Sequence, residues 1–260
     1  KGVINKKFTI RKGQLSSSFN VSIPDMRLWS LDDPFLYKVE ASLDDDQVES
    51  YFGMRKVSVV NLPDSEFPYV ALNNKPIYLQ FALDQSYHQD GFYTFPTDQF
   101  MKEEIIRSKS IGLNGIRIHI KTEIPRKLYW ADKLGLLVVE DLPNSWGEPN
   151  KLMKAESEYT LRQMIKRDYN HPSIISWVIF NEQWGLKTKQ VEISNEGPWE
   201  NEGKIILPET FAWVASMYYL AKSLDQSRLI EDNSPCCGGV HTATDINSCH
   251  AYLPGYEWDE

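Results

Sequence analysis

The 260-residue chain has no run of about 18 uninterrupted apolar residues, the length that a membrane-spanning helix needs. It also lacks a basic run, because 28 Lys and Arg stand against 36 Asp and Glu, for a formal net charge of −8. Nucleic-acid binding requires clustered cations to neutralise phosphates, so this class of partner is excluded. Three cysteines, none in a C-x-x-C arrangement, are too few for a disulfide framework.

The chain opens at Lys1 with neither an initiator Met nor a signal peptide, which indicates an internal piece of a longer protein. Hydrophobic residues make up 42% and charged residues 25% of the sequence, as in ordinary soluble globular proteins. We therefore expect a folded chain that is truncated at both ends. Its composition is compatible with either the bacterial periplasm or the cytoplasm.

Two regions differ in their patterning. Residues 1–62 are rich in β-forming residues, show no helical period and contain turn residues, so they predict a small β-sandwich or most of one. Its predicted strands cover residues 8–10, 19–23, 37–43 and 57–60.

Residues 63–260 alternate short apolar runs with helix-like segments, which is typical of repeated βα units and a parallel sheet. Six strands are predicted, at residues 78–83, 114–119, 136–140, 174–180, 229–230 and 246–250. Four helices are predicted between them, at residues 99–110, 125–133, 155–169 and 208–223.

Polar groups at the carboxyl ends of parallel strands converge on one face, where active sites form. The set includes carboxylates, an amide, an arginine and aromatic rings, without a glycine-rich phosphate loop, and this indicates recognition of a sugar or another polyol. No two histidines fall at helical metal-ligand spacing, so the sequence predicts no metal site. The residues at the predicted strand ends are Asp84, Gln85, Arg117, His119, Glu140, Asp141, Asn181, Glu182, Glu231, Asp232, His250 and Tyr252.

The pair Asn181-Glu182 is the strongest of these signals, because an apolar run delivers it to the mouth of the fourth predicted strand. A glycosidase needs a carboxylic acid there to protonate the departing oxygen, and a neighbouring amide can hold the sugar 2-hydroxyl. The alternative is that the pair only caps the next loop.

Several motifs occur in an order that covers nearly the whole chain. They include Asn-Gly-Ile-Arg at 114–117, Trp-Ala-Asp-Lys-Leu-Gly-Leu at 130–136, and Asn-His-Pro-Ser-Ile-Ile-Ser-Trp at 170–177 before Asn181-Glu182. Leu-Trp-Ser at 28–30 and Phe-Gly-Met-Arg-Lys at 52–56 precede them. This arrangement resembles glycoside hydrolase family 2, the β-galactosidases, β-glucuronidases and β-mannosidases.

The resemblance implies a (β/α)8 TIM barrel over residues 63–260, of which about six strands are present. It also implies a partial immunoglobulin-like β-sandwich over residues 1–62. Glu182 would be the general acid/base and Asn181 the ligand of the 2-hydroxyl. Arg117 would lie beneath the nucleophile or, alternatively, neutralise Glu140.

Other site residues carry two interpretations each. Tyr252 resembles a tyrosine that contacts the nucleophile, although it could pack in the core. His119 is either a substrate contact or a buried hydrogen-bonded histidine, and Trp184 is a sugar platform or a loop anchor. Asp84 is expected to bind a sugar hydroxyl or to be a loop carboxylate in water. His250 is expected to bind substrate.

The sequence departs from the family in two places. Phe81 and Asp84-Gln85 replace a Gly and an Arg-His pair, so the substrate rim differs. The nucleophile, a Glu on the seventh strand in the family, is expected outside this chain, which would leave the fragment itself inactive and its sheet edges unpaired.

The predicted function is that of a retaining β-glycosidase acting on terminal β-linked sugars of a glycoside or oligosaccharide. β-Galactosidase activity is favoured over β-glucuronidase activity. The alternative is an inactive carbohydrate-binding or scaffold protein that keeps the barrel. The mechanism requires no cofactor, although the resemblance leaves open an Mg²⁺ or Na⁺ ion and a homo-oligomer of the full-length protein.

Overall fold

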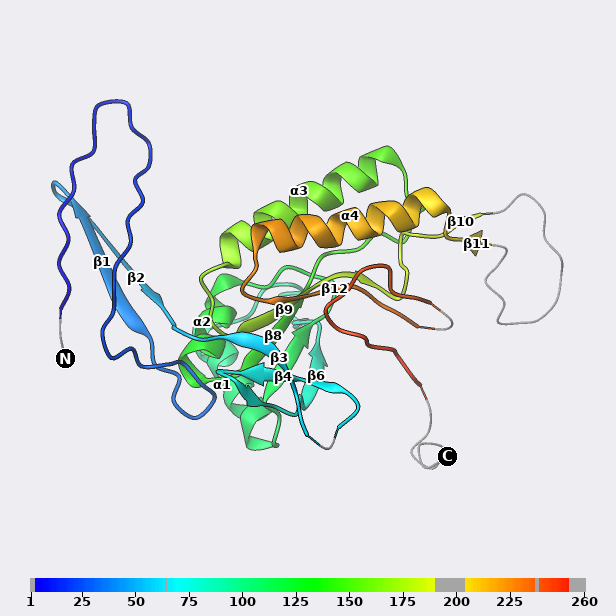
Figure 1. Ribbon diagram of the computed structural model, residues 1–260, viewed down its shortest axis with the longest axis horizontal. Helices are drawn as coiled ribbons and strands as arrows, with labels where there is room; N and C mark the ends of the chain where they lie inside the picture. Colours follow the sequence, from blue (N-terminus) through cyan, green and yellow to red (C-terminus); the bar gives the residue numbers. More distant parts are fainter. Residues whose placement is uncertain (1–2, 64, 190–203, 237–238, 253–260) are drawn as a thin grey trace.

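The computed structural model describes residues 3–63, 65–189, 204–236 and 239–252. At its centre lies a parallel five-stranded sheet with the strand order β12-β9-β8-β7-β6 (Figure 1). Its strands are β6 (Phe81–Asp84), β7 (Gly115–Ile118), β8 (Leu137–Asp141), β9 (Ile174–Asn181) and β12 (Leu229–Ser234). Because all five run the same way, their carboxyl ends lie along one edge.

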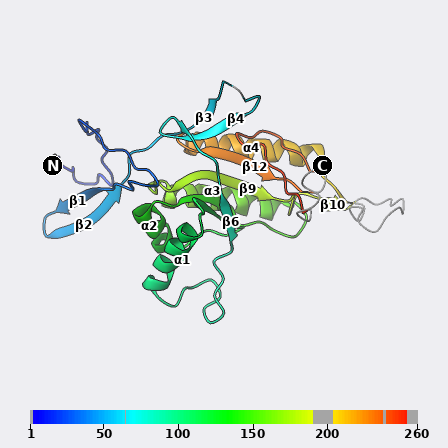
Figure 2. The same cartoon turned by 90° about the horizontal axis from the view of Figure 1, so that it is seen from below.

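Four helices connect the strands of this sheet. They are α1 (Asp98–Ser110), α2 (Pro125–Leu134), α3 (Lys151–Asp168) and α4 (Pro208–Leu224). Helices α1 and α2 pack side by side (Figure 2), as do α3 and α4 (Figure 1). Side chains cap two of them: Thr97 accepts from the amide of Phe100, and Asn150 from that of Met153.

Helix α2 ends at Gly135, a position that only glycine can occupy without strain. Gly135 has a φ of 74°, and a Cβ atom there would collide with the carbonyl oxygen of Leu31. The abrupt stop lets the chain turn directly into β8.

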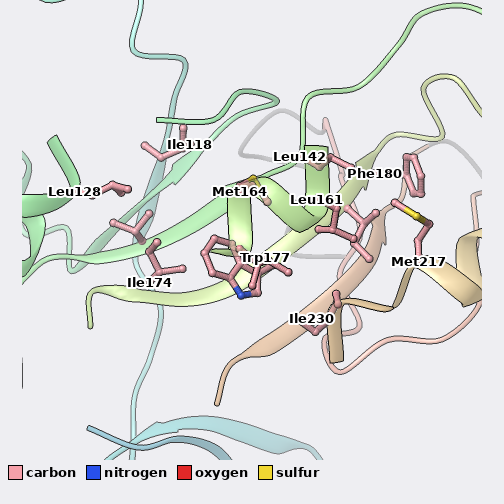
Figure 3. Packing of buried hydrophobic residues seen from close by; sticks show 14 of the residues in the cluster. Ile118, Leu128, Leu142, Leu161, Met164, Ile174, Trp177, Phe180, Met217 and Ile230 are labelled. Carbon is pink, nitrogen blue, oxygen red and sulfur yellow. The ribbon is translucent and has the colours of Figure 1, made fainter. Parts of the chain in front are cut away.

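The hydrophobic core has two layers because side chains alternate across the strands. Val138, Trp177 and Ile179 belong to the buried cluster that includes Leu161 and Met217 of the helices. Figure 3 shows Trp177 in this cluster with Leu161 and Met164. The opposite face of the sheet packs against the amino-terminal part of the chain, through Trp29, Leu72, Leu137, Val139, Ile175 and Val178.

The amino-terminal region forms an antiparallel hairpin and a small antiparallel sheet. The hairpin pairs β1 (Tyr37–Leu43) with β2 (Asp46–Phe52). The sheet contains β3 (Val57–Asn61), β4 (Pro68–Leu72) and β5 (Lys75–Pro76). A short pair, β10 (Thr188–Lys189) with β11 (Lys204–Ile205), lies far from the hairpin (Figure 1).

Some predicted strands are wrong. Residues 8–10 and 19–23 form no strand, and their apolar side chains, such as Phe8 and Phe19, are exposed rather than packed against a second sheet. The first strand of the parallel sheet begins at Phe81 instead of at residue 78.

The predicted sixth strand, residues 246–250, is also absent from the sheet in the described chain; only one isolated bridge joins Cys236 and His250. Two carboxylates, the buried Asp232 and the half-buried Asp245, hold this segment instead. The side chain of Asp232 accepts hydrogen bonds from the amides of Thr242 and Ala243, and Asp245 accepts one from the amide of Ile230. Residues 239–252 therefore follow β12 as a loop that these hydrogen bonds hold against the strand.

The amino-terminal region docks at the end of the sheet where β8 and β9 begin. The indole of Trp29 donates to the carbonyl oxygen of Asp132, and the hydroxyl of Tyr51 donates to its carboxylate, both at 2.7 Å. Arg55 donates to the carbonyl oxygens of Pro172 and Ile174. These contacts lie at the opposite end of the strands from the predicted active site.

Candidate active site

Four strand ends meet at one arginine. The guanidinium of Arg117, on β7, donates from Nη2 to Asp141 on β8 at 2.8 Å and to Oδ1 of Asn181 on β9 at 3.0 Å. The same nitrogen donates to Oγ of Ser234 on β12 at 2.8 Å. The predicted convergence of polar groups at the carboxyl ends of the strands therefore holds for these elements.

Glu182 follows β9 directly and is held from both sides. Its backbone has a φ of 50°, and its amide donates to the carbonyl oxygen of Ser234 at 2.9 Å. The side-chain Oε1 is 2.6 Å from Nδ1 of His250 and accepts a second hydrogen bond from the hydroxyl of Tyr252. The structure thus brings Tyr252, expected near a nucleophile, against the acid/base candidate.

These contacts set the charge of Glu182. Burial raises the pKa of its carboxyl group, but the hydrogen bonds from His250 and Tyr252 outweigh it, and the net pKa lies below its ordinary value. The described part of the chain therefore holds Glu182 as a carboxylate.

Asn181 presents an unused donor. Its Oδ1 accepts from Arg117 and from Ser234, and its backbone N–H donates to Oδ1 of Asn144 at 2.7 Å. The side-chain Nδ2 is buried and has no hydrogen-bond partner among the described residues. Because an unpaired buried donor is costly, this nitrogen fits an oxygen acceptor of a bound ligand.

The predicted alternative that Arg117 neutralises Glu140 is wrong. Arg117 instead makes three hydrogen bonds to the carboxylate of Asp141, at 2.8 to 3.2 Å. Neighbouring residues of a strand point to opposite faces, so Asp141 shares the face of Arg117 while Glu140 points toward the helices. There Glu140 accepts the amide of Glu123 at 2.9 Å, close to Asp168 and Arg167.

This position gives a pH-dependent prediction for Glu140. Burial, and then the charge of Asp168, raise its pKa well above the ordinary 4.5. The unfolded state therefore loses this proton at lower pH than the folded state, and stability falls as pH rises above 4.5. We expect Glu140→Gln to raise the free energy of unfolding at pH 7, measured by urea denaturation.

The same pair of proteins at about pH 4 is the control, because wild-type Glu140 is protonated there in both states and the gain from the substitution should shrink. An equal gain at both pH values would contradict the assignment.

His119 and Trp184 extend the site outward. His119 is buried, its Nδ1 lies 3.0 Å from Nε2 of Gln85, and burial lowers its pKa, which favours the neutral ring. Its ring contacts that of Trp184 edge-on, with the two ring centroids 5.7 Å apart. Trp184 in turn stacks on Trp146, with ring centroids 3.9 Å apart.

Trp146 was not predicted from the sequence as a residue of the site. It lies in the loop after β8, and the residue is 75% exposed. The signal that could have found it is a tryptophan five residues beyond the strand-end carboxylate Asp141. With Trp184 it forms an aromatic surface beside His119, of the kind that covers the apolar face of a ring.

Asp84 lies at the end of β6 as predicted but is already paired. Its carboxylate is 2.5 Å from the buried Nζ of Lys127 and accepts the amide of Ser86 at 2.6 Å. Lys127 also contacts Glu104 and Glu123. A role for Asp84 in sugar binding stays a prediction.

Glu231, on β12, is buried near Arg117 and accepts a hydrogen bond from the hydroxyl of Ser248. Burial raises the pKa of its carboxyl group. Within the described residues, no group of three or more His, Cys, Asp or Glu side chains is arranged to hold a metal ion. The Mg²⁺ or Na⁺ ion that the family resemblance left open stays a prediction.

No helix within the described ranges is long and apolar enough to cross a membrane.

Known proteins match most of the chain. The family description "Glycosyl hydrolases family 2, TIM barrel domain" matches residues 64–257, and "Glycosyl hydrolases family 2" matches residues 2–55. Together with the parallel sheet and its helices, the first match confirms the predicted fold class, although the described chain shows five strands of the barrel.

Two relatives share part of the sequence. A β-galactosidase from Thermoanaerobacterium thermosulfurigenes is 34% identical over 166 residues, 62% of this chain and 22% of the relative. A β-glucuronidase from Streptococcus agalactiae is 28% identical over 183 residues, 62% of this chain and 29% of the relative. The chain therefore spans less than a third of the length of each.

A solved structure agrees in fold. The crystal structure of a β-glucuronidase from Parabacteroides merdae matches with a TM-score of 0.66 at 24% identity, covering 83% of this chain and 25% of that one. At that identity the likeness supports the fold alone.

Proposed function

The chain belongs to glycoside hydrolase family 2, and from this premise we propose that the protein is a retaining β-glycosidase acting on terminal β-linked sugars. One observation carries the proposal. Glu182 is held at the end of β9 by His250 and Tyr252, and the neighbouring Asn181 directs an unpaired amide donor from the same strand end.

The two side chains have separate tasks in the proposed reaction. Nδ2 of Asn181 donates to the 2-hydroxyl of the sugar. Glu182 gives its proton to the glycosidic oxygen as the bond from that oxygen to the anomeric carbon breaks. A second carboxylate, about 5 to 5.5 Å away in retaining enzymes, forms a bond to the anomeric carbon. We expect this second group outside the present chain.

The second half of the reaction reverses the roles. Glu182, now a carboxylate, takes a proton from water while the water oxygen attacks the anomeric carbon, and the covalent bond to the second carboxylate breaks. The lowered pKa of Glu182 in this chain suits this basic step. The acidic step needs a higher pKa, which a nearby ionised second carboxylate would supply by charge repulsion.

For the sugar, we propose a β-galactoside first and a β-glucuronide second, because relatives of this chain carry both names. The stacked rings of Trp146 and Trp184 support a ring-shaped ligand beside His119. No step of this mechanism uses a metal ion.

The test uses the longest natural form of the protein, with p-nitrophenyl β-galactoside and β-glucuronide as substrates. We expect turnover of one of them, and proton NMR should show the β-anomer of the released sugar before mutarotation. Release of the α-anomer first would overturn the retaining mechanism. Sugar binding without turnover would support the carbohydrate-binding alternative.

A further inference from the structure

A line of three side chains runs through the candidate site from β7 to Glu182. Nη1 of Arg117 lies 3.0 Å from Nε2 of His250, and Nδ1 of the same imidazole lies 2.6 Å from Oε1 of Glu182. Both nitrogens of one ring are therefore engaged, one by a cation and the other by the acid/base candidate.

The chemistry of the guanidinium decides where the imidazole carries its proton. Arginine can only donate hydrogen bonds, so Nε2 of His250 must accept with its lone pair. An imidazolium would turn an N–H toward Arg117 at 3.0 Å and set two donors against each other. The arrangement favours the tautomer with its proton on Nδ1, which donates to Glu182.

The orientation of the Arg117 guanidinium is fixed by its other hydrogen bonds. Asp141, Asn181 and Ser234 accept from its other nitrogens. Burial lowers the pKa of Arg117, but Asp141, Glu231 and Glu182 together raise it by more, so its charge is permanent. The arginine thus presents Nη1 to His250 in one orientation.

The two oxygens of Glu182 are unequal as a result. Oε1 accepts from both His250 and Tyr252, whereas Oε2 accepts no hydrogen bond from the described residues. A proton added to Oε1 would compete with these two donors, and a proton added to Oε2 would not.

We propose that Arg117 and His250 are positioning residues: Arg117 holds His250 as the Nδ1–H tautomer, and His250 keeps Oε1 of Glu182 as a permanent acceptor and leaves Oε2 to carry the transferred proton. The part concerning Oε2 rests on the proposed glycosidase function, whereas the tautomer does not. Among the described residues, the charged and titratable groups that face His250 are Arg117 from β7, Glu182 after β9 and Tyr252 on its own segment. Asp141 and Glu231 act on it through Arg117.

The tautomer is tested first, by nitrogen-15 NMR of the imidazole side chains at pH 7 in the 260-residue chain. The His250 signals are assigned as those absent from His250→Asn. We expect a protonated Nδ1 and an unprotonated Nε2, a pattern that Arg117→Met shifts toward Nε2–H or the doubly protonated ring. A wild-type ring protonated at Nε2 would overturn the proposal.

The second test is the pH profile of kcat/KM for an aryl β-glycoside in the longest natural form of the protein. Removal of the Nδ1 donor in His250→Ala should raise the pKa of Glu182, so the basic limb moves up by about one pH unit. His250→Asn places an amide donor near the same point and should restore much of the shift. An unmoved basic limb in His250→Ala would overturn the positioning role.

The two tests separate the possible failures. Absence of turnover by the wild-type protein would overturn the proposed function and, with it, the assignment of Oε2. The NMR result would still decide the tautomer.

Discussion

Glu182→Gln is expected to lower kcat/KM for a disaccharide by about 10²- to 10⁴-fold, the contribution that a positioned general acid makes. The amide cannot protonate the glycosidic oxygen, and an alkoxide leaving group needs that proton. For a dinitrophenyl β-glycoside, Glu182→Gln should lower the rate of the first step much less, because this leaving group departs as an anion without a proton. Steady-state kinetics with both substrates in the longest natural form of the protein measure the difference.

The matched control is Glu156→Gln, on the exposed side of α3, which removes the same charge away from the strand ends. It should leave both kinetic constants within twofold of the wild type, a change of under about 0.5 kcal/mol. Equal losses for the two substrates in Glu182→Gln would contradict a general-acid role and point to a defect in sugar binding.

Asp132→Ala is expected to lower the free energy of unfolding by about 3 to 5 kcal/mol. The carboxylate of Asp132 is fully buried at the docking point of the amino-terminal region. It accepts from the hydroxyl of Tyr51 at 2.7 Å and the amide of Ser173 at 2.9 Å, and lies 2.5 Å from Nδ1 of His171. Its removal leaves these polar groups without an acceptor, and urea denaturation measures the cost.

Asp45→Ala is the control, because Asp45 is exposed in the turn between β1 and β2 and should change stability by under about 0.5 kcal/mol. The free energy of unfolding of Asp132→Asn should lie between those of Asp132→Ala and Asp45→Ala, since its remaining oxygen can still accept from the amide of Ser173. An Asp132→Ala variant as stable as the wild type would show that the amino-terminal region is not anchored through this carboxylate.

The motifs that carried the family resemblance divide into two groups in space. Arg117, Asn181 and Glu182 lie at the carboxyl ends of the strands, where the proposed chemistry occurs. Trp29 and Asp132 lie near the amino ends, where they join the amino-terminal region to the sheet. Sequence order alone could not separate these groups, because both ends of a strand are only a few residues apart along the chain.

By itself, the sequence determined the alternation of strands and helices in the parallel part, since the apolar period that makes each element is local. It also determined which residues reach the strand ends, and from these Asn181-Glu182 as the leading pair. The hairpin strand over residues 37–43 was likewise predictable, and its bounds are those of β1. Nearby residues suffice for such features.

Only the tertiary structure decided which partners these side chains have. Asp141 rather than Glu140 pairs with Arg117 because of the pleat of β8. Residues 239–252 follow β12 as a loop in which Asp232 accepts from the amides of Thr242 and Ala243, and Asp245 accepts from the amide of Ile230. His250 contacts Arg117, which lies 133 positions earlier in the chain, and Glu182, which lies 68 positions earlier. Such contacts depend on the closure of long loops that bring distant parts of the chain together, and a local sequence pattern does not show which distant residues then meet.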